Sequence, residues 1–171
     1  FSENHGPINA VGTAGQFSVG GIVGFARYQI AQEDGFVSVN DNVNTGKITV
    51  NSSTVASCTY FMIGGVMGYC RMDKANTDHV NSNLWNLGEM EIVKVPEVTG
   101  GAKKPRIGGV AASVRDGDTC TIDNSYCYGT ITAFDQTGYT GMIMGMERTD
   151  KVKATNCKVG GKLVTSLSKA E

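Results

Sequence analysis

The chain has little charge, little proline and few aromatic residues, and these scarcities narrow the possible functions. Charged residues make up 18% of its 171 residues and the formal net charge is −1, whereas roughly 25% is typical of soluble domains. A strongly basic nucleic-acid-binding protein is excluded as a class, because a nearly neutral chain offers no broad attractive field for phosphates. No apolar run approaches the roughly 20 residues that span a bilayer, so we expect no membrane-spanning helix.

Motifs that commonly mark catalytic and metal sites are also missing. The histidines, His5 and His79, have no His-Glu-x-x-His context, and neither a Gly-x-Ser-x-Gly elbow nor a phosphate-binding loop occurs. We expect His5 to lie at a frayed end and His79 in a solvated loop. A Ser-His-Asp triad would have to be assembled in space from distant residues. The sequence therefore predicts no enzyme, no catalytic residue and no cofactor.

The cysteines are few and irregularly spaced. None forms a Cys-x-x-Cys pair, so zinc-finger and thioredoxin-like sites lack their spacing and we expect no metal. Buried free thiols are the favoured interpretation, with a single disulfide as the alternative. The five positions are Cys58, Cys70, Cys120, Cys127 and Cys157.

Glycine, in contrast, is abundant at 23 residues, and it recurs in two alternating motifs. An apolar-Gly-Gly-apolar-x-Gly motif begins at Val19 and Ile63 and returns in altered form at Ile107 and Thr140. Its spacings are 44, 44 and 33 residues. In the second motif a glycine is followed two residues later by an aliphatic residue, at spacings of 40, 42, 41 and 32. These glycines are Gly6, Gly46, Gly88, Gly129 and Gly161. Because both spacings shorten together in the last copy, we infer a deletion within a true repeat.

Two columns of similar residues follow the same period. The position five residues before the second-motif glycine holds Asp41, Asn83, Asn124 and Asn156. Four of the five arginines lie six residues after the second glycine position of the first motif, at Arg27, Arg71, Arg115 and Arg148. We assign one domain, residues 1–171, with units of approximately 6–45, 46–87, 88–128 and 129–171. The first unit begins inside a repeat, so we expect a fragment of a longer protein.

The second motif has the two-residue period of a half-buried strand. The inward residues include Ile48, Met90, Ile131 and Leu163, and the outward residues include Val43, Trp85, Tyr126 and Lys158. One repeat offers two short strands and cannot bury its own face, whereas stacked repeats can. We therefore predict an all-β fold, a β-solenoid wound as a right-handed parallel β-helix of about four repeats. The alternative is an antiparallel β-sandwich. Loops are expected at residues 27–37, 71–82 and 93–105.

These motifs resemble the GLUG repeat of bacterial surface and secreted proteins, in which Gly-Gly-Leu-Val-Gly precedes Asn-Cys-Tyr-x-x-Gly-x-aliphatic. The segment 20–24 is similar to the first half, and 124–131 and 156–163 are similar to the second half. The chain departs from the pattern at Ala111, Ala112 and Met142, and its repeats are longer. The resemblance implies an extracellular or bacterial cell-surface stalk or adhesion segment. Some family members are peptidases, but nothing here matches their zinc site.

Three groups of side chains are candidates for binding. The arginine column either clamps turn carboxylates and carbonyls or binds acidic glycans, whose carboxylates and sulfates suit guanidinium groups. The acids that follow the arginines are Glu33, Asp34, Asp73, Asp116 and Asp150. Trp85 and Tyr126 share an outward column and are expected to be neighbours, either stacking on sugar rings or lying under loops. Asp116 and Asp118 form either a solvated turn or part of a calcium site.

Two functions are consistent with this pattern. The favoured one is a non-enzymatic repeat module of an exported bacterial cell-surface protein, with a role in adhesion or as a spacer or stalk. Its partners would be host or bacterial glycans or a surface protein. The alternative is a carbohydrate-binding module or a segment of a carbohydrate-active enzyme. Carboxylates clustered in a groove beside Trp85 would favour this alternative, and a smooth, polar face without a cleft would favour the first function.

Overall fold

The computed structural model describes residues 1–11, 16–28, 39–52, 60–72, 79–94, 104–115, 120–134, 138–147 and 152–166, in which every regular element is a β-strand. All strand pairs among these residues are parallel. The predicted all-β parallel stack is therefore confirmed, and the antiparallel sandwich is wrong. No helix in these described ranges is long and apolar enough to cross a membrane.

The strands form five parallel sheets, here called A to E. Sheet A is made of β1 (Ser2–Asn4), β5 (Asn42–Asn44), β10 (Leu84–Asn86), β15 (Tyr126–Cys127) and β20 (Lys158–Val159). Sheet B is made of β2 (Ile8–Ala10), β6 (Ile48–Asn51), β11 (Met90–Lys94), β16 (Ile131–Phe134) and β21 (Leu163–Ser166). Sheet C is made of β3 (Gln16–Gly20), β7 (Tyr60–Gly64), β12 (Arg106–Gly108) and β17 (Tyr139–Gly141). Sheet D is made of β4 (Val23–Tyr28), β8 (Met67–Met72), β13 (Ala111–Arg115) and β18 (Met144–Glu147). Sheet E is made of β9 (His79–Ser82), β14 (Cys120–Asp123) and β19 (Val152–Thr155).

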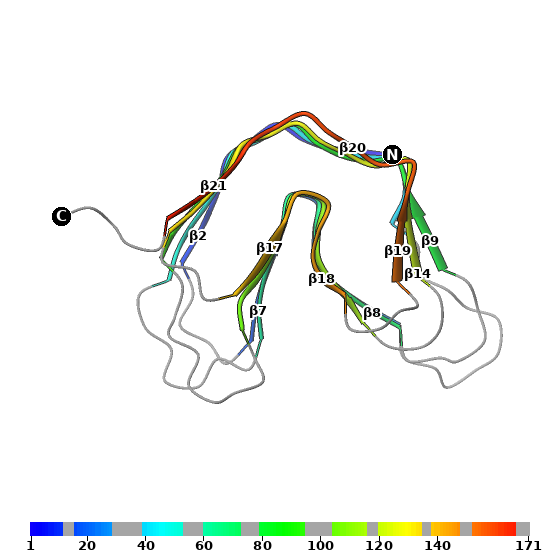
Figure 1. The fold of residues 1–171 in the computed structure, drawn as a ribbon, viewed down its shortest axis with the longest axis horizontal. Coiled ribbons are helices and arrows are strands. Elements are labelled where there is room, and N and C mark those ends of the chain that lie inside the picture. Colours follow the sequence, from blue (N-terminus) through cyan, green and yellow to red (C-terminus); the bar gives the residue numbers. More distant parts are fainter. Residues whose placement is uncertain are drawn as a thin grey trace.

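Each repeat makes one coil of the stack, and the coils superpose when viewed along it (Figure 1). Sheets A and B form a continuous outer arc, and the turn between sheets C and D points up toward that arc (Figure 1). A coil through all five sheets has five strands, so the expectation of two strands per repeat is wrong. The deletion in the last repeat falls between sheets B and C. There β16 ends at Phe134 and β17 begins at Tyr139, whereas β11 ends at Lys94 and β12 begins at Arg106.

The predicted loops begin too early and cover one strand. Arg27 and Tyr28 belong to β4, and residues 93 and 94 belong to β11. Residues 79–82, placed in a loop from the sequence, form β9 and pair with β14. His79 therefore starts a strand rather than lying in a loop. Four residues are too short a segment to show clear alternation among the polar residues that surround them.

The predicted inward column is confirmed in the middle of the stack. Ile48, Met90 and Ile131 are almost completely buried and lie in register on neighbouring strands. Leu163 continues the column but is 40% exposed, because its strand β21 lies at the edge of sheet B. Burial of aliphatic side chains between successive coils supplies the main favourable free energy of such a stack.

The corner that precedes sheet A uses left-handed backbone before β5, β10, β15 and β20. Asp41, Asn83, Asn124 and Asn156 have φ angles of 56°, 57°, 44° and 53°. Aspartate and asparagine tolerate this conformation better than other residues with a side chain, which explains the composition of the column. The side chains also connect successive coils, since Asn124 Nδ2 donates to Asn83 Oδ1 and Asn83 Nδ2 donates to Asp41 Oδ1, both at 2.6 Å.

The two sequence motifs meet inside the coil. Asn4 Nδ2 donates to Asn44 Oδ1 at 2.8 Å, and Asn44 Nδ2 donates to Asn86 Oδ1 at 2.9 Å. This buried amide ladder of sheet A faces the turn between sheets C and D. A Cβ atom on Gly65 would overlap both the Asn86 amide and the carbonyl oxygen of Gly109. The second glycine of the Gly-Gly motif is therefore required by the close approach of the asparagine column.

Candidate functional site

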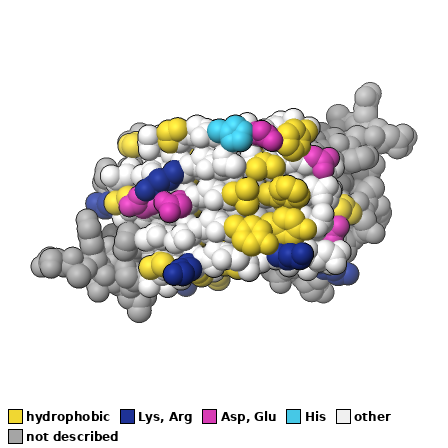
Figure 2. All heavy atoms as spheres, turned by 90° about the horizontal axis from the view of Figure 1, so that it is seen from above, with side chains coloured by type: hydrophobic (Ala, Val, Ile, Leu, Met, Phe, Trp, Pro, Cys, Tyr) yellow, Lys and Arg dark blue, Asp and Glu magenta, His cyan; other side chains and the backbone are white. Residues whose placement is uncertain are grey.

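The outward face of sheet A carries a strip of aromatic side chains, and the strip consists of Trp85, Tyr126 and Tyr128. Trp85 and Tyr126 pair in register on β10 and β15, with ring centroids 5.5 Å apart, which confirms that they are neighbours. Tyr126 and Tyr128 have ring centroids 6.2 Å apart. Trp85 is 37% exposed and Tyr128 is 50% exposed. Figure 2 shows hydrophobic side chains gathered on this face of the molecule.

Contacts within the coil and from the next coil hold the two tyrosines of the strip in place. The Tyr126 hydroxyl donates to Asn124 Oδ1 at 2.6 Å, which ties the ring to the left-handed corner of its own coil. Lys158 Nζ lies 5.6 Å from the centroid of the Tyr126 ring. Tyr128 lies so close to the next coil that a Cβ atom on Gly160 would overlap its ring. A hydrogen bond and a nearby lysine therefore hold the Tyr126 ring, and the absence of a side chain at Gly160 makes room for the Tyr128 ring. Part of each ring stays accessible to solvent.

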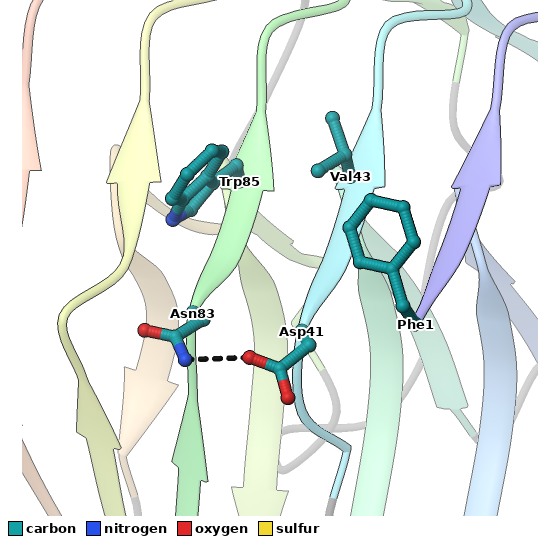
Figure 3. Close-up of a pocket in the computed structure, with 5 residues that line it drawn as sticks. All are labelled: Phe1, Asp41, Val43, Asn83 and Trp85. Atoms are coloured by element: carbon teal, nitrogen blue, oxygen red, sulfur yellow. Dashed lines mark hydrogen bonds between the residues drawn. The ribbon is translucent and has the colours of Figure 1, made fainter.

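Beside the strip lies a hollow of about 310 Å³, lined by Phe1, Asp41, Val43, Asn83 and Trp85. Figure 3 shows Trp85, Val43 and Phe1 on three successive strands, with Asp41 and Asn83 at the entrance to their strands. One wall of the hollow is apolar and the other carries a carboxylate and an amide. An amphipathic hollow of this kind can bind a ligand that has both an apolar face and hydroxyl groups.

The polar wall has unused hydrogen-bonding capacity. Asp41 Oδ1 accepts from Asn83 Nδ2, but no hydrogen bond to Asp41 Oδ2 is found among the described residues. The indole N–H of Trp85 likewise has no partner in the part of the chain that the structure describes. Asp41 Oδ2 is therefore available as a hydrogen-bond acceptor, and the indole N–H of Trp85 is available as a donor.

A separate charged patch lies on the outward face of sheet B. Lys47 Nζ is 2.6 Å from Glu91 Oε2, and the hydrogen bond and charge of Glu91 raise the pKa of Lys47. The surrounding surface, a shallow hollow of about 220 Å³, also includes Glu89, Thr130 and Thr132. Figure 2 shows basic and acidic side chains together on this face, beside the group of hydrophobic side chains. Exposed ion pairs of this type contribute little free energy and are screened by salt.

The arginine column is in register but lies on another sheet. Arg27, Arg71 and Arg115 pair along β4, β8 and β13 of sheet D. Arg148 lies outside the described residues, as do Glu33, Asp34, Asp73, Asp116, Asp118 and Asp150. The proposed carboxylate clamp and the calcium site therefore stay predictions. The arginine column and the aromatic strip belong to different sheets and do not make one site.

The fifth arginine and the cysteines are structural residues. Arg106 is 3% exposed and donates to Ser113 Oγ at 2.9 Å across sheets C and D. Four cysteines are free thiols, as predicted, and Cys58 lies outside the described residues. Burial raises the pKa of Cys70 to about 12, and the pKa of Cys120 and of Cys127 to about 11. Such thiols are poor nucleophiles because the thiolate form is disfavoured.

His5 is not frayed, contrary to the expectation from the sequence. Its Nδ1 lies 2.7 Å from Thr45 Oγ1 on the next coil, and its Nε2 lies 2.9 Å from Glu3 Oε2. Within the described ranges no group of three or more histidine, cysteine, aspartate or glutamate side chains is placed to hold a metal ion.

Sequence reasoning identified Trp85 and Tyr126 but missed their polar partners, Asp41 and Asn83. The column of aspartate and asparagine was visible in the repeat, yet only the left-handed corner places it beside the indole. No family model, curated protein or solved structure matches the chain.

Proposed function

We propose that this chain is a non-enzymatic adhesion module of an exported bacterial surface protein. The single observation that carries the proposal is the exposed aromatic strip on an outer face of a continuous parallel stack. In-register strands make the stack a stiff support, because each coil is hydrogen-bonded to its neighbours along every sheet. An aromatic strip on such a support is presented at a fixed orientation to any surface it meets.

The composition of the outer face supports an adhesive role rather than a purely spacing role. A passive spacer needs only polar outward columns, and much of sheet B follows that rule with Lys47, Glu89 and Glu91. Sheet A instead exposes Trp85, Leu87 and Tyr128 on its outward face. Grouped exposed apolar side chains are commonly interaction sites. The resemblance to GLUG repeats supports the bacterial exterior as the location.

Two measurements test this proposal. Antibodies raised against the folded chain should stain intact cells of the organism that produces it, and staining only after permeabilisation would overturn the surface location. Beads coated with the folded chain should be retained under flow on immobilised mucin or on epithelial cells. Beads coated with the urea-unfolded chain are the control. Equal retention of both bead types, or retention of neither, would overturn the adhesive role.

A further inference from the structure

We propose that the hollow beside Trp85 is a binding site for neutral glycans, in which one pyranose ring stacks on the indole and its hydroxyls bond to Asp41 and Asn83. This inference rests on the adhesive function proposed above and names its ligand class and its site. All five lining residues belong to three adjacent coils of sheet A or to the corners that precede them.

The apolar wall suits the C–H face of a sugar. Trp85 presents an indole that is 37% exposed, flanked along the stack by Val43 on one side and Tyr126 on the other. Flat, rigid aromatic rings lose little conformational entropy on binding and bury a large area per residue. The strip continues from Trp85 to Tyr126 along the axis of the stack, so a linear glycan can extend beyond the first ring.

The polar wall suits sugar hydroxyls. Asp41 Oδ2 is a charged acceptor that no described residue occupies, and Asn83 holds the other carboxylate oxygen at 2.6 Å. The left-handed backbone at Asp41 and Asn83 sets where both side chains leave the corner, and the hydrogen bond between them orients the carboxylate. A hydroxyl that donates to a fixed carboxylate makes a charge-assisted hydrogen bond, which is stronger than a bond between neutral groups.

The charge of the hollow selects neutral rather than acidic glycans. Among the described residues that line it, Asp41 carries the one ionisable side chain, and Glu3 lies in the column next to Val43. A uronate, sulfate or phosphate group placed there would meet like charge. Lys158 lies over the ring of Tyr126, at the opposite end of the strip from Glu3.

A sugar fits this surface better than a folded protein does. A stable protein interface buries about 800 Å² on each partner, whereas the hollow measures about 310 Å³, and charged side chains lie at both ends of the strip, Glu3 beside Val43 and Lys158 over Tyr126. Small-ligand sites typically have volumes of about 300 Å³ or more. The hollow therefore has the size of a subsite for one or two sugar units.

The chain contains one tryptophan, so its fluorescence reports on this site alone. The probes are three neutral hexasaccharides, from maltose, cellulose and mannan series, and an anionic hyaluronan hexasaccharide. We expect a saturable change in emission with at least one neutral probe and at least tenfold weaker binding of the anionic probe. No saturable change with any neutral probe, or tighter binding of hyaluronan, would overturn the proposal.

Three variants locate the bound sugar. Asp41→Asn should weaken binding about tenfold, because a neutral acceptor replaces the carboxylate, and should still fold, because asparagine occupies this corner in three other coils. Trp85→Ala, followed by calorimetry, should remove measurable binding. Tyr139→Ala is the matched control, since Tyr139 is 44% exposed on sheet C and lies outside the hollow. Unchanged affinity in the first two variants, or loss in Tyr139→Ala, would refute the assignment.

The outcome separates this inference from the adhesive function. If beads carrying Trp85→Ala are retained as well as the original beads and no neutral probe binds, the chain is adhesive through another surface and the glycan site is refuted. If the hollow binds neutral sugars but coated beads are not retained, the glycan site stands and the adhesive function is refuted.

Discussion

Replacing Cys127 with asparagine should stabilise the protein by completing the buried amide ladder. In the first two coils each amide donates twice, once to the next asparagine and once to a glycine carbonyl in its own turn. Asn44 Nδ2, for example, lies 2.9 Å from Asn86 Oδ1 and 3.1 Å from the Gly46 carbonyl oxygen. The pattern stops at Asn86, whose fully buried Nδ2 finds no oxygen acceptor among the described residues and meets only the sulfur of Cys127. Its in-register neighbour on β15 is Cys127.

The expected gain follows from replacing a sulfur, which is a weak hydrogen-bond acceptor, with an amide oxygen. A buried donor without any partner costs about 1–3 kcal/mol, which sets the upper limit of the gain. Asparagine at position 127 would accept from Asn86 and donate to the Gly129 carbonyl oxygen, which the Cys127 sulfur now approaches at 3.8 Å. The larger side chain fits, because Asn86 has the same relation to Gly65 that residue 127 has to Gly109. Allowing for desolvation of the new amide, we expect the free energy of unfolding to rise by about 1 kcal/mol.

Urea denaturation followed by circular dichroism measures the change, with a Tm increase of about 2–4 °C as a second readout. Cys127→Ala is the control, since it removes the thiol and adds no acceptor, and it should destabilise the protein. The double variant with Asn86→Ala isolates the new bond, whose coupling energy should be at least about 0.5 kcal/mol. A Cys127→Asn variant that is less stable than the original, or a coupling energy of zero, would refute this account of the ladder.

Three further predictions concern packing and ionisation. Gly65→Ala should lower the free energy of unfolding by at least about 3 kcal/mol, the upper range for overpacking, since its Cβ meets backbone of the next coil; unchanged urea midpoints would contradict this. Because burial raises the pKa of Cys70 to about 12 and of Cys120 to about 11 from an ordinary 9.0, the unfolded chain loses these protons first. The contribution of these thiols to stability should be constant below about pH 9 and be lost as the pH rises toward 12, and iodoacetamide at pH 8 should label both thiols only after unfolding. Hydrogen bonds from Thr155 and Asn156 lower the pKa of Asp123, so its carbon chemical shift in NMR should titrate below the usual range, and Thr155→Val should raise that pKa.

The column pattern was readable from the sequence because the stack repeats the same environment in every coil. Residues such as Ile48, Met90 and Ile131 meet identical neighbours, so their apolar character recurs at the repeat period. The same logic placed Trp85 beside Tyr126 and Arg71 beside Arg115. Parallel in-register pairing converts a period along the chain into contact in space, which is why periodicity alone predicted the ladders.

Sequence alone determined the all-β class, the parallel stack and the membership of its columns, whereas the path of each coil was decided only by tertiary structure. The inward turn between sheets C and D brings Gly65 against Asn86, although nothing in the spacing of the two motifs states that they touch. The hollow also depends on that path, because the left-handed corner turns Asp41 toward Trp85. The repeat period of the sequence indicates which residues occupy equivalent positions in successive coils. Contacts within one coil depend on the backbone angles at its corners, and the repeat period marks where a corner recurs without stating how it directs the chain.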